Sequence, residues 1–255
     1  MADHDIIMEF TGVSKAFGEN VIYDDMDLAI RRGEVLTVLG RSGTGKSVML
    51  RMMLGLLPAD GGSIAFDGQD IVDLDEVGLL PIRRAIGMVF QNSALFDSLT
   101  VLENIAYPLI ERGIEDEQVI AERVAEVLQM VGLPGIEDML PADLSGGMRK
   151  RVALARAVAE SPSLMLYDEP TTGLDPPNVR RICDLILALR SSLALSSVVV
   201  THDLPSAYRV SDRLALIADH RVALIDDVQP FRDSAVPQVQ SFLHAMDVDP
   251  TGEVR

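Results

Sequence analysis

One eight-residue segment constrains the fold of this chain more than any other feature. Residues 40–47 read GRSGTGKS, which fits the pattern G-x-x-x-x-G-K-[ST]. The segment follows a short apolar run, VLTVL (35–39), and precedes an apolar helical run, SVMLRMMLGLL (47–57). A buried strand, a glycine-rich loop and a helix in this order form a phosphate-binding loop. The sequence therefore predicts an α/β fold with a nucleotide site at this loop.

Different residues of this loop are expected to contact different parts of a bound polyphosphate. Glycines let the main chain wrap phosphate oxygens and point its N–H groups inward. Lys46 is expected to neutralise the β- and γ-phosphates, and Ser47 to bind Mg²⁺. The predicted ATP-binding residues of the loop are Gly40, Arg41, Ser42, Gly43, Thr44, Gly45, Lys46 and Ser47.

Short apolar runs alternate with helical patterns along the chain, which predicts a mainly parallel core sheet. The N-terminal part differs, because three runs separated by turn residues are typical of antiparallel strands flanking that sheet. The buried-strand candidates are VLTVL (35–39), IGMVF (86–90), LMLYD (164–168), SVVVT (197–201) and LALIA (214–218), and the antiparallel candidates are IIMEFTGV (6–13), DMDLAI (25–30) and GSIAFDG (62–68).

Strand patterns disappear between Asn92 and Pro141, where residues 115–131 repeat apolar side chains at helical spacing. We therefore expect one domain over residues 1–230, with a helical subdomain inserted at about 92–160. The remaining residues, 231–255, are expected to form a tail with one short amphipathic helix and an acidic end.

Composition narrows the class of protein. The formal net charge of −17 argues against broad nucleic-acid binding, which needs a basic surface. The one cysteine, Cys183, lies in an apolar periodic run and is expected to be buried on a helix. The start of the chain lacks the basic and apolar regions of a signal peptide, and no apolar run reaches the roughly 18 residues of a membrane helix. We therefore expect a soluble, cytoplasmic protein.

Polar residues follow three of the predicted strands. Asp168 ends LMLYD and Glu169 comes next, so the pair is expected beside the phosphates, although the pair taken alone is also compatible with a solvated turn before Pro170. Asp168 would hold Mg²⁺ through water, and Glu169 would orient or deprotonate the attacking water. His202 and Gln91 follow two other strands, and each taken alone is as compatible with a structural role. The predicted catalytic residues are Glu169, His202 and Gln91, and the predicted metal ligands are Ser47, Gln91 and Asp168.

A second phosphate-directed segment is LSGGMRKRVALARA (144–157). The residues Ser-Gly-Gly at 145–147 stand before a helical run, and three cations at 149–151 crowd its first turns. Positive side chains are badly placed there, because a helix N-terminus already carries partial positive charge. This arrangement suits an anion, above all phosphate.

Together these motifs resemble the ATP-binding cassette family, the nucleotide-binding subunits of ABC transporters. The resemblance extends from about Ile7 into the 240s. It rests on the Walker A loop GRSGTGKS, the Q-loop Gln91, the signature LSGGM, the Walker B run LMLYDE, the D-loop GLDP and the H-loop His202, in the order of the family. It implies a P-loop NTPase fold of the ABC ATPase type, ATP and Mg²⁺ as cofactors, and ATP hydrolysis.

The resemblance also implies a dimer. Two cassettes pack head to tail, so that each ATP lies between the Walker A loop of one copy and the signature of the other. Asp175 of the D-loop would connect the two sites, and Phe17 would stack on adenine where the family more often has tyrosine. The signature residues, which would act in trans, are Leu144, Ser145, Gly146, Gly147 and Met148. Met148, in place of the commonest glutamine, and Gly173, in place of serine or alanine, depart from the family pattern, and neither is taken to alter activity.

Among cassettes, residues 90–109, the signature segment and the tail's VPQVQSFL are most similar to the ATPase of bacterial Mla/Mce-type lipid transport systems. This resemblance implies a homodimer on the inner face of the cytoplasmic membrane, driving a permease that moves phospholipid or a related lipid. Further partners would be an Mce-type substrate-binding protein and a small cytoplasmic accessory protein, with no nucleic acid. Amino-acid importers and cell-division cassettes share much of 90–109, so an importer ATPase or a regulatory cassette remains open.

The amphipathic segment 236–246 leaves three alternatives open. It packs on its own domain, docks on the second cassette or an accessory protein, or lies on a membrane surface. The last is disfavoured because the segment carries almost no basic charge.

Overall fold

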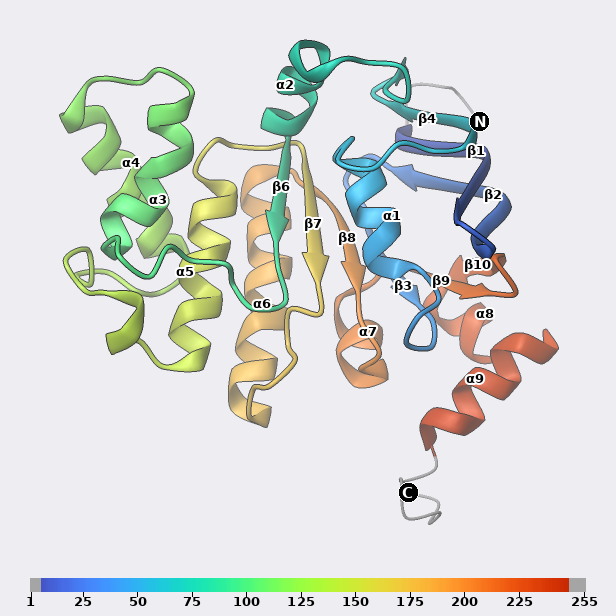
Figure 1. The fold of residues 1–255 in the computed structure, drawn as a ribbon. Helices are drawn as coiled ribbons and strands as arrows, with labels where there is room; N and C mark the ends of the chain where they lie inside the picture. Colours follow the sequence, from blue (N-terminus) through green and yellow to red (C-terminus); the bar gives the residue numbers. More distant parts are fainter. Residues whose placement is uncertain (1–5, 248–255) are drawn as a thin grey trace. The chain divides into compact units, whose positions relative to one another are not determined.

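The computed structural model describes residues 6–247 of the chain. These fold into two compact units, the first formed by residues 6–83 and 196–247 and the second by residues 84–195. Figure 1 shows the elements in chain order. The acidic end predicted for the tail lies outside the described residues.

The first unit contains the antiparallel sheet that the N-terminal runs predict. The order of its strands is β2-β1-β4-β5, and β1 pairs with both β2 and β4 in antiparallel register. These strands are β1 (Ile6–Phe17), β2 (Asn20–Arg31), β4 (Gly61–Phe66) and β5 (Gln69–Asp70).

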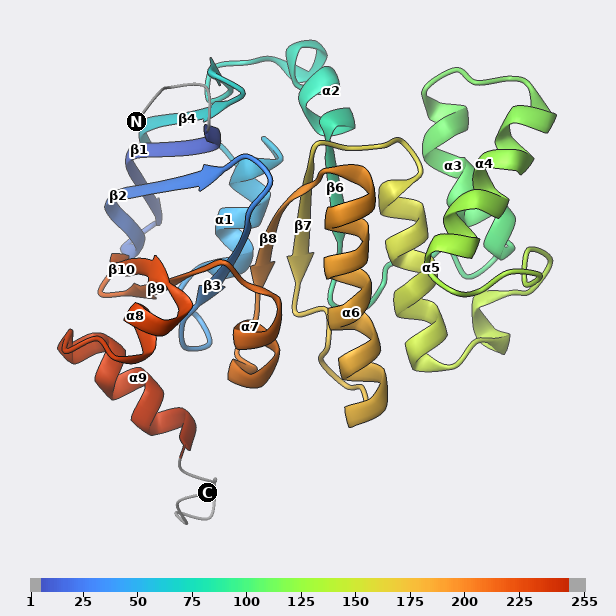
Figure 2. The same cartoon turned by 180° about the vertical axis from the view of Figure 1, so that it is seen from behind.

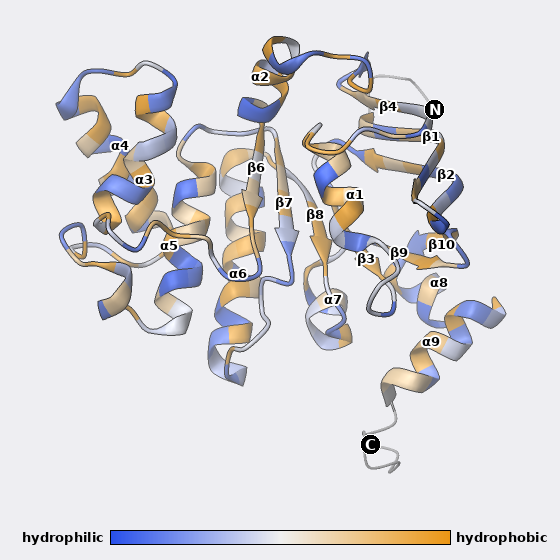
Figure 3. Cartoon of the chain, in the orientation of Figure 1, coloured by the Kyte–Doolittle hydropathy of each residue, from blue (hydrophilic) through white to orange (hydrophobic). Residues whose placement is uncertain are grey.

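The same unit contains a parallel group of strands. β3 (Val35–Leu39) pairs in parallel with β8 (Ser196–Val200) on one side and β9 (Arg213–Ala218) on the other. All five residues of β3 and of β8 are buried, as their apolar runs predict, and Figure 3 colours β8 as hydrophobic. β10 (Arg221–Asp227) adds an antiparallel edge that the sequence analysis missed, because its residues are only half-buried and end in two aspartates.

Five helices complete the first unit or lead out of it. α1 (Lys46–Met53) ends earlier than its apolar run, just before Gly55, whose φ is +61°. The C-terminal helix packs on this unit, since Val239 and Phe242 join a buried cluster with Leu39 and Leu216. This contact bears out the first of the three alternatives for the tail. The other helices are α2 (Glu76–Ala85), α7 (Leu204–Val210), α8 (Val228–Arg232) and α9 (Pro237–Asp247).

The second unit combines two parallel strands with a group of helices. β6 (Ile86–Val89) pairs with β7 (Leu164–Asp168), and Figure 2 shows α6 (Pro176–Leu193) alongside this pair. No strand occurs between Asn92 and Pro141, as predicted, and Cys183 is buried on α6, also as predicted. The helices that pack together are α3 (Val101–Glu111), α4 (Glu117–Met130) and α5 (Gly146–Val158), and a short 3-10 turn occupies Pro141–Asp143.

The predicted α/β class is therefore confirmed, with parallel core strands, an antiparallel β part and a helical part. Within the described range, 6–247, no helix is both long enough and apolar enough to span a membrane.

Candidate nucleotide site

In the first unit, the glycine-rich loop connects β3 to α1 as predicted. Gly43 and Gly45 have φ of +84° and +96°, in the region that favours glycine. A Cβ on Gly45 would lie 2.4 Å from Ile22 Cγ2, so this position has neither the backbone nor the space for a side chain. The loop is therefore shaped by glycine at the point where α1 begins.

Lys46 occupies the centre of this loop. Its Nζ donates hydrogen bonds to the carbonyl oxygens of Gly40, at 2.7 Å, and Arg41, at 3.0 Å, and the side chain is buried. These bonds curl the loop around an ammonium group, the geometry expected of a cation that faces phosphate. Ser47, next along α1, is exposed.

A buried tyrosine, Tyr23, contacts the glycine-rich loop. It is not among the site residues predicted from the sequence. The hydroxyl of Tyr23 on β2 donates a 2.8 Å hydrogen bond to the carbonyl oxygen of Gly45. Burial raises the pKa of this phenol well above its usual range, so the hydroxyl keeps its proton. No local signal marks Tyr23, because it precedes Gly45 by 22 residues in the sequence.

Phe17, the predicted adenine-stacking residue, ends β1 and is 49% exposed. The strand end is held by Asp60, which accepts hydrogen bonds from Lys15 Nζ and the Ala16 N–H, both at 2.7 Å. The Lys15 side chain lies 5.4 Å from the Phe17 ring centroid. An exposed aromatic face on a fixed strand end suits stacking on a base.

His202 follows β8 in the same unit. Because β3 and β8 are parallel and Val38 pairs with Val200, the loops after both strands leave the same edge of the sheet. The structure therefore brings His202, which is exposed, to the edge that carries the glycine-rich loop.

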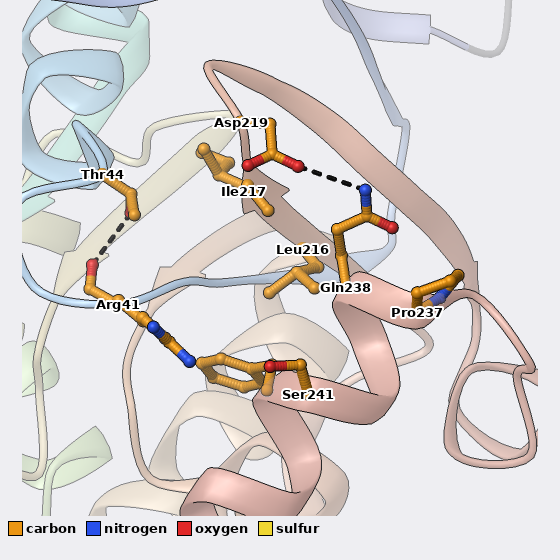
Figure 4. A pocket seen from close by; sticks show the side chains of 10 residues that line it. Arg41, Thr44, Leu216, Ile217, Asp219, Pro237, Gln238 and Ser241 are labelled. Carbon is orange, nitrogen blue, oxygen red and sulfur yellow. Dashed lines mark hydrogen bonds between the residues drawn. The ribbon is translucent and has the colours of Figure 1, made fainter.

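A cavity of about 490 Å³ lies between this loop and α9. Figure 4 shows the Arg41 side chain extending toward α9, and Gln238 of α9 donating to Asp219 at 3.1 Å. The C-terminal helix thus borders the nucleotide loop of its own unit.

The second unit carries the predicted carboxylates and Gln91. β6 and β7 are parallel with Val89 opposite Tyr167, so Gln91 and Asp168 leave adjacent strands at one edge. Glu169 has a φ of +48°, which is strained for a residue with a side chain and is found chiefly at functional sites. Its Oε2 accepts a hydrogen bond from Thr172 Oγ1 at 3.2 Å.

The signature segment forms the N-terminus of α5. Ser145 is the N-cap, and its Oγ accepts a hydrogen bond from the Met148 N–H at 3.2 Å. Ser145 and Gly146 are exposed, whereas Leu144 is buried. Gly147 packs against α6, where a Cβ would lie 2.8 Å from Asn178 Oδ1, so a larger residue would have to displace the Asn178 side chain. Asp175 of the D-loop is the N-cap of that same helix.

The cations in the first turns of α5 donate hydrogen bonds to main-chain carbonyl oxygens. Lys150 Nζ donates to the Gln91 carbonyl oxygen, and Arg151 Nη1 donates to those of Val131 and Gly132 at 3.2 and 3.0 Å. Arg149 Nη1 donates to the carbonyl oxygen of Leu144 at 2.6 Å. Each of these cations binds a main-chain carbonyl, as Lys46 also does, so contact of the segment with phosphate stays a prediction.

The donors predicted for a metal fit Mg²⁺ by type. Ser47, Asp168 and Gln91 offer a hydroxyl, a carboxylate and an amide oxygen, the hard ligands that Mg²⁺ prefers. Across residues 6–247 no cluster of three His, Cys, Asp or Glu side chains forms a metal cage. This composition suits an ion bound mainly by substrate phosphates and water rather than by the protein alone.

Comparison with known proteins agrees with these motifs. The family described as ABC transporter matches residues 23–172. The chain is 38% identical over 247 residues to a probable ribonucleotide transport ATP-binding protein, Mkl, of Mycobacterium leprae, covering 97% of this chain and 71% of that protein. It is 39% identical over 216 residues to the intermembrane phospholipid transport system ATP-binding protein MlaF of Haemophilus influenzae, covering 85% and 82%.

A methionine import ATP-binding protein, MetN of Brucella abortus, is also 39% identical over 244 residues, covering 94% of this chain and 65% of that protein. Among solved structures, a dimeric ATP-binding cassette in a post-hydrolysis state, bound to ADP and phosphate, is 34% identical with a TM-score of 0.79. The match covers 87% of this chain and 98% of that one.

Proposed function

The chain belongs to the ABC transporter family and is an ATP-binding ATPase subunit, and from this premise we propose that it powers the movement of phospholipid or a related lipid between bacterial membranes. The observation that carries the lipid substrate is the likeness to MlaF, a phospholipid transport protein of which the match covers 82%. Residues 90–109, which resemble this type of system, lie within the part of the chain that the family matches, 23–172.

We propose that the active form is a head-to-tail homodimer. The signature N-terminus is exposed at Ser145 and Gly146, and its N-cap geometry leaves a positive helix end facing outward. A partner's Lys46 would hold the same γ-phosphate from the other side. The dimeric cassette bound to ADP and phosphate supports this arrangement, since it is 34% identical to this chain.

In the proposed reaction the chain's own residues position ATP and water. Lys46 and the loop amides would bind the phosphates, and Phe17 would stack on adenine. Glu169 would take a proton from the attacking water, which His202 and Gln91 would help to orient. Mg²⁺, held by Ser47 with Asp168 and Gln91, would supply charge neutralisation on the phosphates when bound.

The proposed permease contact is an apolar pocket of about 340 Å³ in the second unit. Its lining includes Phe90, Phe96 and Tyr107, which are 41 to 43% exposed, and the last two rings lie 4.9 Å apart. Exposed aromatic side chains around a pocket are typical of a protein-binding surface. A short cytoplasmic helix of an integral membrane permease fits here, next to the Gln91 loop. This contact would hold the subunit on the inner face of the cytoplasmic membrane.

An Mce-type substrate-binding protein, reached through the permease, and a small cytoplasmic accessory protein complete the proposed assembly.

A second candidate function is ATP supply to an amino-acid-type importer, favoured by the 39% identity to MetN. A regulatory, cell-division type of cassette is a third candidate, which the acidic residue Glu169 in its strained catalytic position weighs against.

The test is purification of the tagged chain from bacterial membranes, with mass spectrometry of partner chains and extracted lipid. Co-purification with an Mce protein and phospholipid is the expected result. A solute-binding protein for amino acids in the complex would overturn the lipid substrate and leave the ATPase assignment intact.

The Glu169→Gln variant tests the proposed catalytic residue. It should bind ATP, remain as a closed dimer and lose nearly all turnover. Wild-type hydrolysis by this variant would contradict the role of Glu169.

A further inference from the structure

The main chain after Gln91 adopts a conformation that needs support. Ser93 and Ala94 have φ of +64° and +47°, although neither is glycine. Each residue in this region costs on the order of 1–3 kcal/mol, and such a pair persists only when its surroundings hold it. Ser93 is buried, so solvent does not supply that support.

Two cations of α5 hold this segment. Lys150 Nζ donates to the Gln91 carbonyl oxygen, while Arg156 donates from Nη2 to Ser93 at 3.0 Å and from Nη1 to Ala94 at 2.8 Å. Hydrogen bonds from a charged donor are about twice as strong as neutral ones. Three of the four carbonyls from 91 to 94 are therefore bound to the helix that begins with the signature.

The same cations also reach the surroundings of the segment. Lys150 is buried and is attracted by Asp168 and Glu169, the two carboxylates after β7. The Arg156 guanidinium lies 6.0 Å from the Phe96 ring centroid and lines the pocket proposed for the permease. One helix thus connects the signature, the Gln91 segment, the acidic pair and the permease pocket.

We propose that Lys150 and Arg156 are positioning residues that bind the Gln91 segment to α5, so that displacement of the signature helix carries Gln91 with it. Both side chains donate their hydrogen bonds to main-chain oxygens of the segment, so we expect them to act on catalysis through Gln91 and not on ATP directly. The inference rests on the proposed catalytic role of Gln91. It gives one of the three cations in the first turns of the signature helix, Lys150, a function in coupling that helix to Gln91.

Arg151 provides a matched control on the same helix. It also donates to two carbonyl oxygens, but those of Val131 and Gly132 at the end of α4. Removing its charge weakens a comparable contact without touching the Gln91 segment. A merely structural role for α5 cations predicts that Lys150 and Arg151 variants behave alike.

The experiment compares Lys150→Met, Arg156→Met, Lys150→Arg, Arg151→Met and Gln91→Ala in the full-length chain. ATP turnover and amide hydrogen exchange are measured for each. We expect kcat to fall about 10-fold in Lys150→Met and Arg156→Met, the size typical of supporting residues, with little change in KM for ATP. Exchange should accelerate in residues 91–96 and stay unchanged in the loop at 40–47. Lys150→Arg should restore kcat and protection, and Arg151→Met should leave both near wild type.

The proposal is overturned if Lys150→Met matches Arg151→Met, or if exchange accelerates throughout the chain. Should Lys150→Met fail to fold, Lys150→Gln retains a neutral donor and makes the same comparison. If Gln91→Ala lowers kcat but Lys150→Met and Arg156→Met do not, the positioning role fails while the proposed catalysis stands. If Gln91→Ala leaves kcat unchanged, the proposed role of Gln91 fails, and this inference fails with it.

Discussion

Two helices of this chain, α1 and α5, each follow a segment that is predicted to bind phosphate. The N-termini of the two helices differ in structure. α1 starts at Gly45, whose φ is +96°, with no side-chain cap from the described residues. α5 starts at Ser145, an extended N-cap whose hydroxyl already binds the Met148 N–H. The first helix leaves its N–H groups to a ligand and adds the Lys46 ammonium, whereas the second satisfies one N–H itself.

The cations of the two helices also differ in where they make their hydrogen bonds. Lys46 lies inside its own loop, bound by the carbonyls of Gly40 and Arg41. Lys150 and Arg151 point away to other segments of their unit. We therefore propose that the Walker A helix forms a complete phosphate site and the signature helix a partial one. This difference supports the proposal that the signature completes a site whose phosphate is held by another copy.

The largest expected effect comes from removing the cation of the complete site. Lys46→Met should lower ATP turnover by about 10²–10³-fold, because the phosphates lose their only ammonium donor in the loop. Steady-state hydrolysis and nucleotide binding measure this loss. Arg51→Met removes an exposed cation from the last turn of the same helix and is the matched control. Equal losses in both variants would show that helix charge in general, and not the loop, sets the effect.

Ser145 variants separate capping from phosphate contact. Aspartate is as good an N-cap as serine, so Ser145→Asp should keep stability, while its negative charge should repel the triphosphate and lower turnover about 10²-fold. Ser145→Ala should cost about 1 kcal/mol of unfolding free energy with a smaller loss of turnover. Thermal unfolding and hydrolysis are measured together. Thr100→Ala, which removes the capping box of α3, should lose stability but not turnover, and a wild-type rate in Ser145→Asp would refute the phosphate contact.

Tyr23 tests the support beneath the complete site. Tyr23→Phe removes one of the two hydrogen bonds that the Gly45 carbonyl oxygen accepts, the other coming from the Met49 N–H, at a cost of about 0.5–1.5 kcal/mol in unfolding free energy. The affinity for ATP should fall several-fold, because the loop is less well held. Denaturant unfolding and nucleotide titration check both effects. Tyr107→Phe, in the second unit, is the control, and equal losses of ATP affinity would count against the loop contact.

The smallest expected effect concerns the strand end that presents Phe17. Hydrogen bonds from Lys15 and the Ala16 N–H lower the pKa of Asp60 below its usual value. A lowered pKa stabilises the native state above the ordinary carboxyl pKa, and this stabilisation disappears as pH falls through the native pKa. Asp60→Asn should weaken the contacts that fix the end of β1 and so loosen the position of Phe17. We therefore expect the variant to have a slightly higher KM for ATP near neutral pH. Its melting temperature should converge with that of wild type below about pH 4, and a constant difference at all pH values would contradict the assignment.

Local patterns account for what the sequence could predict. The loop at 40–47, the strand before the acidic pair and the helix after the signature are each defined by neighbouring residues, and the structure forms the predicted element at each. β10 escaped prediction because its half-buried residues lack a clear apolar run. The contact of Lys150 with Gln91 joins residues 59 positions apart, so the charge of the α5 cations was visible while their partners were not.

The central claim is that each ATP site combines the Walker A loop of one copy with the signature of another. A mixture of Ser145→Asp and Lys46→Met proteins tests it most directly, because each heterodimer would contain one intact and one doubly altered site. ATP hydrolysis should be very low for either variant alone and should recover on mixing. The Ser145→Asp/Lys46→Met double variant mixed with itself provides the baseline. If the mixture stays at that baseline while the two variants demonstrably form heterodimers, the signature does not complete the site of another copy and the account is wrong.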